Sequence, residues 1–105
     1  MAPKGAARVF ASLGDETRLR LIVRLCEYGP LSITRLTAGS RVTRQAVTKH
    51  LRVMERAGLV RGMRRGRENV WQLEAYRLEQ AQRYIGLISA RWKHAIERLR
   101  TRAAN

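Results

Sequence analysis

The chain has 105 residues, the size of one domain, and carries 22 Lys and Arg against 8 Asp and Glu, a formal net charge of +14. Such an excess of positive charge favours polyanionic partners, which are nucleic acid or an anionic membrane surface. The single cysteine, Cys26, excludes an intramolecular disulfide and favours a reducing compartment, and no apolar run has the length of a membrane span. We therefore expect a soluble cytoplasmic protein with no membrane partner.

The positive charge is concentrated in the middle of the chain. Between Arg35 and Arg67 the sequence holds ten basic residues and a single acid, Glu55. A merely solvated surface would mix the two signs, so this concentration favours a binding face. The partner that such a face predicts is nucleic acid.

The first elements that we expect are a tail and a short helix. Residues 1–5 are predicted to form a loose tail. A first helix is predicted over residues 6–13, where Val9 and Phe10 are apolar positions, and Gly14 would end it.

A second helix is predicted over residues 16–28, with Asp15 as its N-cap and Gly29 at its end. Its apolar residues are spread around much of the circumference, which predicts a helix buried on more than one side and central to the core. Cys26 belongs to this pattern, so we expect it to be a small buried hydrophobe. A redox sensor would need an exposed thiol of low pKa.

Residues 32–58 carry the pattern of two helices joined by a turn. Ser32 has the side chain of an N-cap and would start a short third helix that Gly39 ends. Thr43 would cap a fourth helix, which Gly58 ends as a residue able to adopt the left-handed conformation. Two helices joined by a glycine-containing turn, the second of them basic, predict a helix-turn-helix.

The two faces of the fourth helix differ in chemistry. One carries an apolar stripe that would face the core, formed by Val47, Leu51 and Met54. The other carries amide, hydroxyl and basic side chains, which contact base edges and phosphate oxygens. The predicted DNA-binding residues of this helix are Thr43, Arg44, Gln45, Thr48, Lys49, His50 and Arg52. For His50, a phosphate contact and simple packing are both open interpretations.

Residues 59–73 predict a β-hairpin. Two short runs with β-branched and aromatic residues, LVRGMRR and ENVWQL, are separated by Gly66 and Arg67. A basic hairpin directly after a recognition helix is the wing of a winged helix, placed to contact phosphate or a minor groove. The predicted DNA-binding residues of the wing are Arg61, Arg64, Arg65 and Arg67. A solvated basic loop is the competing interpretation, above all for Arg61.

A long last helix is predicted over residues 75–100. Its apolar positions are spaced 3, 4, 3, 4, 3 and 4 residues apart, a heptad seam that packs against another helix. Because the core is already formed upstream, we expect the partner to be the same helix of a second copy, assisted by the first helix. The predicted dimer interface is Val9, Phe10, Leu78, Ala81, Ile85, Ile88, Trp92, Ala95 and Leu99.

This order of elements and three local strings resemble the ArsR/SmtB family of bacterial winged-helix repressors. The strings are LGDETRLRLIVRL, TRQAVTKHLRVMERAGLV and RRGRENVWQL, and the resemblance covers about residues 10–99. It implies that residues 1–105 form one winged helix-turn-helix domain, mainly α with a small β-hairpin, in the order α-α-α-α-β-β-α. It also implies a homodimer, joined through its terminal helices, that represses transcription from an inverted-repeat operator in double-stranded DNA.

Neither metal site of this family is intact in the sequence. Many relatives carry Cys-Val-Cys-Asp where residues 32–35 here are Ser-Ile-Thr-Arg, which supply no thiolate for a thiophilic ion. On the last helix His94 and Glu97 match half of a second site, but Ala81 and Arg83 stand where the other ligands would be. We therefore expect no metal and no cofactor, and we interpret His94 as a surface or dimer-interface residue.

The sequence predicts a sequence-specific transcriptional repressor that acts as a homodimer and is not metal-regulated. The alternative is a sequence-tolerant architectural DNA-binding protein, which the large charge supports. Gln45 and Thr48 discriminate between the two, since a pure phosphate binder could use Lys and Arg alone. An enzyme is not expected, because the chain has no paired carboxylates in helical register, no Gly-rich phosphate loop and no Cys-His motif. No pattern in the sequence identifies an effector.

Overall fold

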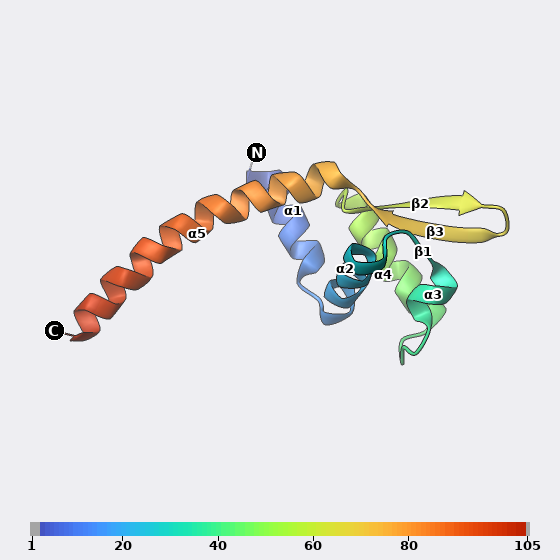
Figure 1. The fold of residues 1–105 in the computed structure, drawn as a ribbon, viewed down its shortest axis with the longest axis horizontal. Helices are drawn as coiled ribbons and strands as arrows, with labels where there is room; N and C mark the ends of the chain where they lie inside the picture. The colour runs from blue at the N-terminus through green and yellow to red at the C-terminus, as the bar shows by residue number, and fades with distance from the viewer. Residues whose placement is uncertain (1–2, 105) are drawn as a thin grey trace.

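The computed structural model describes residues 3–104, with side chains from residue 5 onward (Figure 1). In chain order its elements are α1 (Pro3–Leu13), α2 (Glu16–Tyr28), β1 (Leu31–Ser32), α3 (Ile33–Thr37), α4 (Arg44–Arg56), β2 (Val60–Arg65), β3 (Glu68–Leu73) and α5 (Ala75–Ala104). The first four helices and the sheet form the body of the protein, and α5 extends away from it (Figure 1).

Local sequence signals determine where the helices begin and end. The side chains of Asp15, Ser32 and Thr43 each accept the backbone N–H of the residue three positions later, at 3.1, 3.2 and 3.1 Å, so all three predicted N-caps are confirmed. Gly29 and Gly58 follow the ends of α2 and α4 with φ angles of 73° and 81°. Glycine adopts this left-handed conformation without steric cost, so the chain leaves both helices at these residues.

The core lies between α2, α3, α4 and the sheet. The predicted apolar stripe of α4 is confirmed, because Val47, Leu51 and Met54 are all buried. They pack in one cluster with buried side chains of the other elements, among them Leu25 and Leu36. Burial of this stripe fixes the rotation of α4 about its axis and turns the polar face of the helix toward solvent.

The predicted hairpin is confirmed, and it forms the wing. Strands β2 and β3 are antiparallel, with Arg65 paired to Glu68 across the two-residue turn. Gly66 has a φ angle of 59°, and Arg67 has no positive φ. A positive φ at the first turn residue but not at the second matches a type II′ hairpin turn, which requires glycine at its first position.

A third strand, which the sequence does not reveal, joins the hairpin. In β1, Leu31 pairs with Trp71 and Ser32 pairs with Val70, so the antiparallel sheet has the order β1-β3-β2. Two residues are too few to show a period-two pattern, and their partner strand lies far along the chain. This pairing ties the start of α3 to the wing.

Helix α1 begins at Pro3, so the predicted loose tail is wrong for residues 3–5, while residues 1–2 lie outside the described part of the chain. Proline is well suited to the first turn of a helix, because its φ is already helical and an N–H there would have no partner. Phe10 of α1 lies against Tyr84 of α5, with ring centroids 6.3 Å apart.

Helix α2 is buried on one side only. Leu21 and Leu25 face the core, whereas Leu19 and Val23 are 48% and 51% exposed and Cys26 is exposed. The prediction of a helix buried on more than one side, with Cys26 in the core, is therefore wrong. Apolar residues around a helix do not show how many neighbours it has, and here α1, α4 and β3 cover one side of α2.

Helix α5 has 30 residues, a length of about 45 Å, in a molecule that measures 63 × 30 × 21 Å. It runs past the predicted end at residue 100 to Ala104. Its first part packs on α1, and Ala81 is buried there. Within residues 3–104 no helix is long and apolar enough to cross a membrane.

These elements make a mainly helical winged helix-turn-helix with a three-stranded antiparallel sheet and a long C-terminal helix. Helices α3 and α4 form the helix-turn-helix, and β2 with β3 forms the wing. The order predicted from the sequence is confirmed, with β1 as its one addition.

Candidate nucleic-acid interface

The outward face of α4 brings together most of the residues predicted to contact bases. Arg44, Gln45 and Lys49 are exposed in the N-terminal half of the helix, next to the exposed cap Thr43. Thr48 is half-buried, and its hydroxyl donates to the carbonyl oxygen of Arg44 at 2.9 Å. The hydroxyl oxygen of Thr48 can therefore only accept a hydrogen bond from a further partner.

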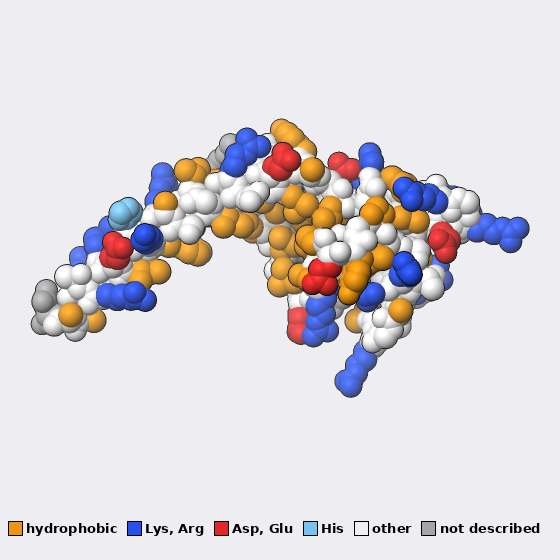
Figure 2. Space-filling model, in the orientation of Figure 1, with side chains coloured by type: hydrophobic (Ala, Val, Ile, Leu, Met, Phe, Trp, Pro, Cys, Tyr) orange, Lys and Arg blue, Asp and Glu red, His pale blue; other side chains and the backbone are white. Residues whose placement is uncertain are grey.

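None of the ion pairs within residues 3–104 involves Arg44 or Lys49. The positive charge on this face is thus not neutralised by the protein itself. In Figure 2 basic side chains also project from the tip of the wing, at the right of the molecule, and from the turn between α3 and α4, at the bottom of the molecule. An unneutralised basic surface of this kind attracts a polyanion.

His50 belongs to the contact between α2 and α4. Its side chain is 24% exposed, and its Nδ1 lies 3.3 Å from Nη1 of Arg18 and 3.9 Å from Oδ1 of Asp15. Of the two interpretations of His50, this geometry favours packing. The backbone N–H of Arg18 also holds the pKa of the Asp15 carboxyl below its ordinary value of 3.8.

Arg52 connects α4 to the wing. Its Nη1 donates to Oε1 of Glu55 at 2.9 Å, and its guanidinium lies 5.2 Å from the ring centroid of Trp71. The other carboxylate oxygen, Oε2, accepts the backbone N–H of Gly62 in β2 at 3.3 Å. One carboxylate and one guanidinium therefore link the wing to α4.

Glu55 is a residue of this surface to which the sequence analysis assigned no role. It is the only acid between Arg35 and Arg67, and this isolation was the available signal. An acid retained in a basic surface weakens attraction for a polyanion, so a structural reason for it is expected. The bridge to Gly62 and Arg52 supplies that reason.

The four predicted arginines of the wing have different surroundings. Arg61 forms an ion pair with Glu74, Nε to Oε1 at 3.1 Å, at the base of the wing. Arg64 donates from Nε to a carbonyl oxygen of the turn at 3.2 Å. Arg65 and Arg67 are exposed on either side of Gly66 in the turn. The three arginines near the tip are therefore the ones available to a polyanion.

The residues predicted for the dimer interface fall into two groups. Val9 and Ala81 are buried in the core of their own chain, and Phe10 and Leu78 are partly buried against it. Beyond the body, the same face of α5 continues as an apolar row that extends away from the rest of the chain. Its members are Ile85, Ile88, Trp92, Ala95 and Leu99. Of these, Ile85, Trp92 and Leu99 are 52%, 66% and 63% exposed.

No group of three or more metal-ligating side chains occurs among the residues that the structure describes. His94 and Glu97 lie side by side on α5, with Nδ1 3.9 Å from Oε2, and both are exposed. The hydroxyl of Ser32 is engaged as the N-cap of α3.

An amphipathic second helix in a helix-turn-helix, followed by a basic wing, defines a DNA-binding transcriptional regulator, and the comparisons with known proteins agree. A family model described as a helix-turn-helix domain matches residues 13–62. The uncharacterized HTH-type transcriptional regulator YuzN of Bacillus subtilis (strain 168) is 40% identical over 68 residues, 59% of this chain and 74% of that protein.

Solved structures point to the same class. An ArsR-like transcriptional regulator from Rhodococcus sp. RHA1 is 31% identical, with a TM-score of 0.72 over 91% of this chain and 90% of that one. The homodimeric winged helix-turn-helix DNA-binding domain of Mb0332 from Mycobacterium bovis has a TM-score of 0.66 at 19% identity, over 90% of this chain and 83% of that one, and shows the shared fold. The chain belongs to the ArsR family of helix-turn-helix transcriptional regulators, a family of DNA-binding proteins and not of enzymes.

Proposed function

We propose that the protein is a homodimeric, sequence-specific transcriptional repressor that reads an inverted-repeat operator with α4. The observation that carries this proposal is the division of α4 into a buried apolar stripe and an exposed face with Arg44, Gln45 and Lys49. Arginine and lysine pair with guanine edges and glutamine with adenine edges in the major groove. These side chains lie in the N-terminal half of the helix, the part that reaches base edges in helix-turn-helix proteins.

The wing has a different role in this proposal. Arg64, Arg65 and Arg67 present positive charge on a short hairpin that Glu55 and Arg52 hold against α4. Contacts from such side chains to phosphate oxygens add affinity and fix the orientation of the protein without reading sequence.

We infer that two copies associate through the exposed apolar row of α5. Ile85, Trp92 and Leu99 continue the face that Leu78 and Ala81 bury against the chain's own body. An exposed apolar row of this length marks a protein–protein interface. The Mb0332 domain, which has the same fold, is homodimeric, and this supports the association of two copies.

The proposed repressor is not regulated by metal. The thiolates of the first family site are absent at Ser32 and Thr34, and His94 and Glu97 lack further ligands on their helix. Titration of the untagged protein–DNA complex with zinc, cadmium or nickel should leave its affinity unchanged. Stoichiometric metal binding with release of DNA would contradict this part of the proposal.

The second candidate function is that of a sequence-tolerant architectural DNA-binding protein, which the net charge of +14 favours. One experiment separates the two functions. The affinity for a duplex from upstream of the protein's own gene is compared with that for a random duplex of equal length, at one salt concentration. A repressor should prefer the upstream duplex by about a thousandfold or more. Equal affinities would identify the architectural function instead.

A further inference from the structure

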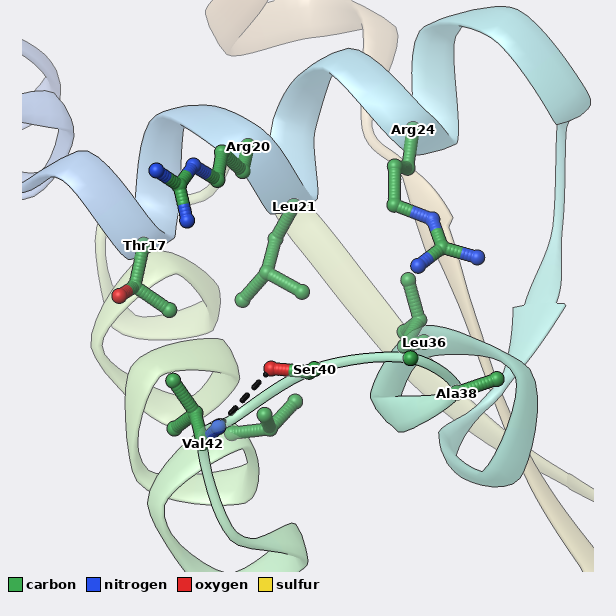
Figure 3. A pocket seen from close by; sticks show the side chains of 10 residues that line it. Thr17, Arg20, Leu21, Arg24, Leu36, Ala38, Ser40 and Val42 are labelled. Carbon is green, nitrogen blue, oxygen red and sulfur yellow. Dashed lines mark hydrogen bonds between the residues drawn. The ribbon is translucent and has the colours of Figure 1, made fainter.

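A cavity of about 180 Å³ lies between α2 and the turn that joins α3 to α4 (Figure 3). Its floor is formed by apolar side chains of the core edge, Leu21, Leu36, Val42 and Val47. Figure 3 shows Leu21 pointing from α2 into its middle. An apolar cavity of about 150 Å³ is large enough to hold benzene, so a ring or a short branched chain fits here.

Two arginines stand over this apolar floor. Arg20 and Arg24 are four residues apart on α2 and therefore lie on one face of the helix, and both line the cavity. Nη2 of Arg24 donates to the carbonyl oxygen of Arg35 at 2.9 Å, which holds the guanidinium toward α3. Arg20 forms an exposed ion pair with Glu16, a partner that an incoming anion can displace at little cost.

We propose that this cavity binds a small organic carboxylate with an apolar body of about the size of benzoate, and that this ligand regulates DNA binding. A guanidinium forms two parallel hydrogen bonds with a carboxylate. The hydroxyls of Thr17 and Ser40 line the same cavity and add polar partners near its wall. The floor carries no polar side chain, so the ligand must be apolar at its other end.

The wall of this cavity is also part of the helix-turn-helix. Oγ of Ser40 accepts the backbone N–H of Val42 at 3.0 Å, and this turn leads directly into Thr43, the N-cap of α4. A ligand that displaces the turn therefore moves the N-terminal end of α4, where the proposed base contacts lie. Because binding coupling is reciprocal, DNA must change the affinity for the ligand by the same factor. This regulatory role rests on the proposed function, whereas ligand binding does not.

The first test uses the full-length protein and benzoate, with benzamide as a neutral probe of the same shape. Benzoate should shift the backbone amide resonances of Leu21, Ser40 and Val42, and benzamide should bind about tenfold more weakly. The double variant Arg20→Gln/Arg24→Gln should lose about tenfold or more of the benzoate affinity. A control with the same charge change on α5, Arg98→Gln/Arg102→Gln, should lose none. The spectra also show whether each variant is folded. Unmoved cavity resonances would overturn the proposal.

The second test measures DNA binding by the wild-type protein and the same two double variants. Benzoate should change the affinity of the wild-type protein for its upstream duplex by about fivefold or more, and have no such effect on the Arg20→Gln/Arg24→Gln variant. Benzoate that binds without changing DNA affinity would overturn the regulatory site. The regulatory site would also be overturned by a lower salt dependence of the Arg20→Gln/Arg24→Gln variant on random DNA, with a slope of log affinity against log salt about one below that of the α5 control variant. The two arginines would then contact a phosphate of DNA. Loss of any preference for the upstream duplex, with the benzoate shifts intact, would refute the proposed function and not the binding site.

Discussion

Gly58 and Arg77 are packed so closely that the chain has room only for a glycine at position 58. A Cβ on Gly58 would lie 2.6 Å from Cγ of Arg77, and Gly58 has a φ angle of 81°. Arg77 is held in place in turn, since Nη1 donates to Oε1 of Gln80 at 3.1 Å and the guanidinium lies 5.7 Å from the ring centroid of Tyr76. The start of α5 is thereby seated against the turn that ends α4.

The first prediction follows from this close packing. Gly58→Ala should lower the free energy of unfolding by about 2 kcal/mol or more, because left-handed backbone strain and a collision with Arg77 add to each other. Urea denaturation measures the change. In an Arg77→Ala background the cost of the same substitution should fall to about 1–2 kcal/mol, the strain alone. An equal cost in both backgrounds would show that the collision with Arg77 does not contribute to the cost of Gly58→Ala.

The glycines and caps were predictable because their signals are local. Asp15, Ser32, Thr43 and Gly58 each act on residues within one helical turn, and the structure confirms all four. Strand β1 was not predictable, because two residues carry no period and the register with β3 depends on the tertiary fold. The extent of burial of α2 was not predictable either, because it depends on neighbours that lie far away along the chain.

The same distinction applies to the candidate site. The exposed residues of α4 follow from its helical period, since burial of one stripe determines the opposite face. The environment of His50 does not follow from this period, because Arg18 of α2 and Asp15, the N-cap of α2, approach it from another part of the chain. The link from Glu55 to Gly62 does not follow from it either, because one hydrogen bond there joins a helix to a strand. Side-chain roles that depend on two elements require the structure.

The second prediction concerns this link. Glu55→Ala should lower the free energy of unfolding by about 1–2 kcal/mol, because the N–H of Gly62 and the guanidinium of Arg52 both lose their acceptor. Glu79→Ala, at an exposed position of α5, removes the same charge and should change stability by less than about 0.5 kcal/mol. Chemical denaturation of the two variants side by side gives the comparison. If both have the same stability, the carboxylate does not hold the wing.

The third prediction is a dependence of stability on pH. The hydrogen bond from the backbone N–H of Arg18 lowers the pKa of Asp15 in the folded chain, so the ionised carboxylate is the form that stabilises α2. This contribution is fully present above the ordinary value of 3.8 and is lost as the pH falls through the lower pKa of the folded state. Asp15→Asn keeps an N-cap but cannot titrate. Its loss of stability on acidification should be smaller than that of the wild type, as thermal unfolding at a series of pH values will show.

The fourth prediction tests the proposed dimer. Ile85→Asp places a charge in the exposed apolar row of α5 and should yield monomers in sedimentation experiments, with loss of operator binding. The monomer should stay folded, because the buried part of α5 ends at Ala81. Ala90→Asp introduces the same side chain on the opposite face of α5 and should leave the association unchanged. A wild-type protein that sediments as a monomer at micromolar concentration would rule out the dimer.

The last prediction concerns the division of labour between α4 and the wing. If α4 lies in the major groove, Gln45→Ala or Lys49→Ala should cost about 1–3 kcal/mol on the operator and relax preference at particular base pairs. Arg65→Ala or Arg67→Ala should weaken binding to specific and random DNA about equally. Each should also reduce the slope of log affinity against log salt by about one, because one phosphate is then no longer neutralised by the protein.

The structure provides an internal control for this assignment. Arg61 is paired with Glu74 at the base of the wing, so Arg61→Ala should change the salt slope less than either substitution at the tip. Dimer symmetry adds a geometric condition, since the two half-sites should be about one helical turn of DNA, or a multiple of it, apart. Fluorescence anisotropy on operator and random duplexes at several salt concentrations measures all these quantities. Should wing substitutions alter base preference while those in α4 alter only the salt slope, the wing reads the sequence and α4 anchors the protein to the backbone.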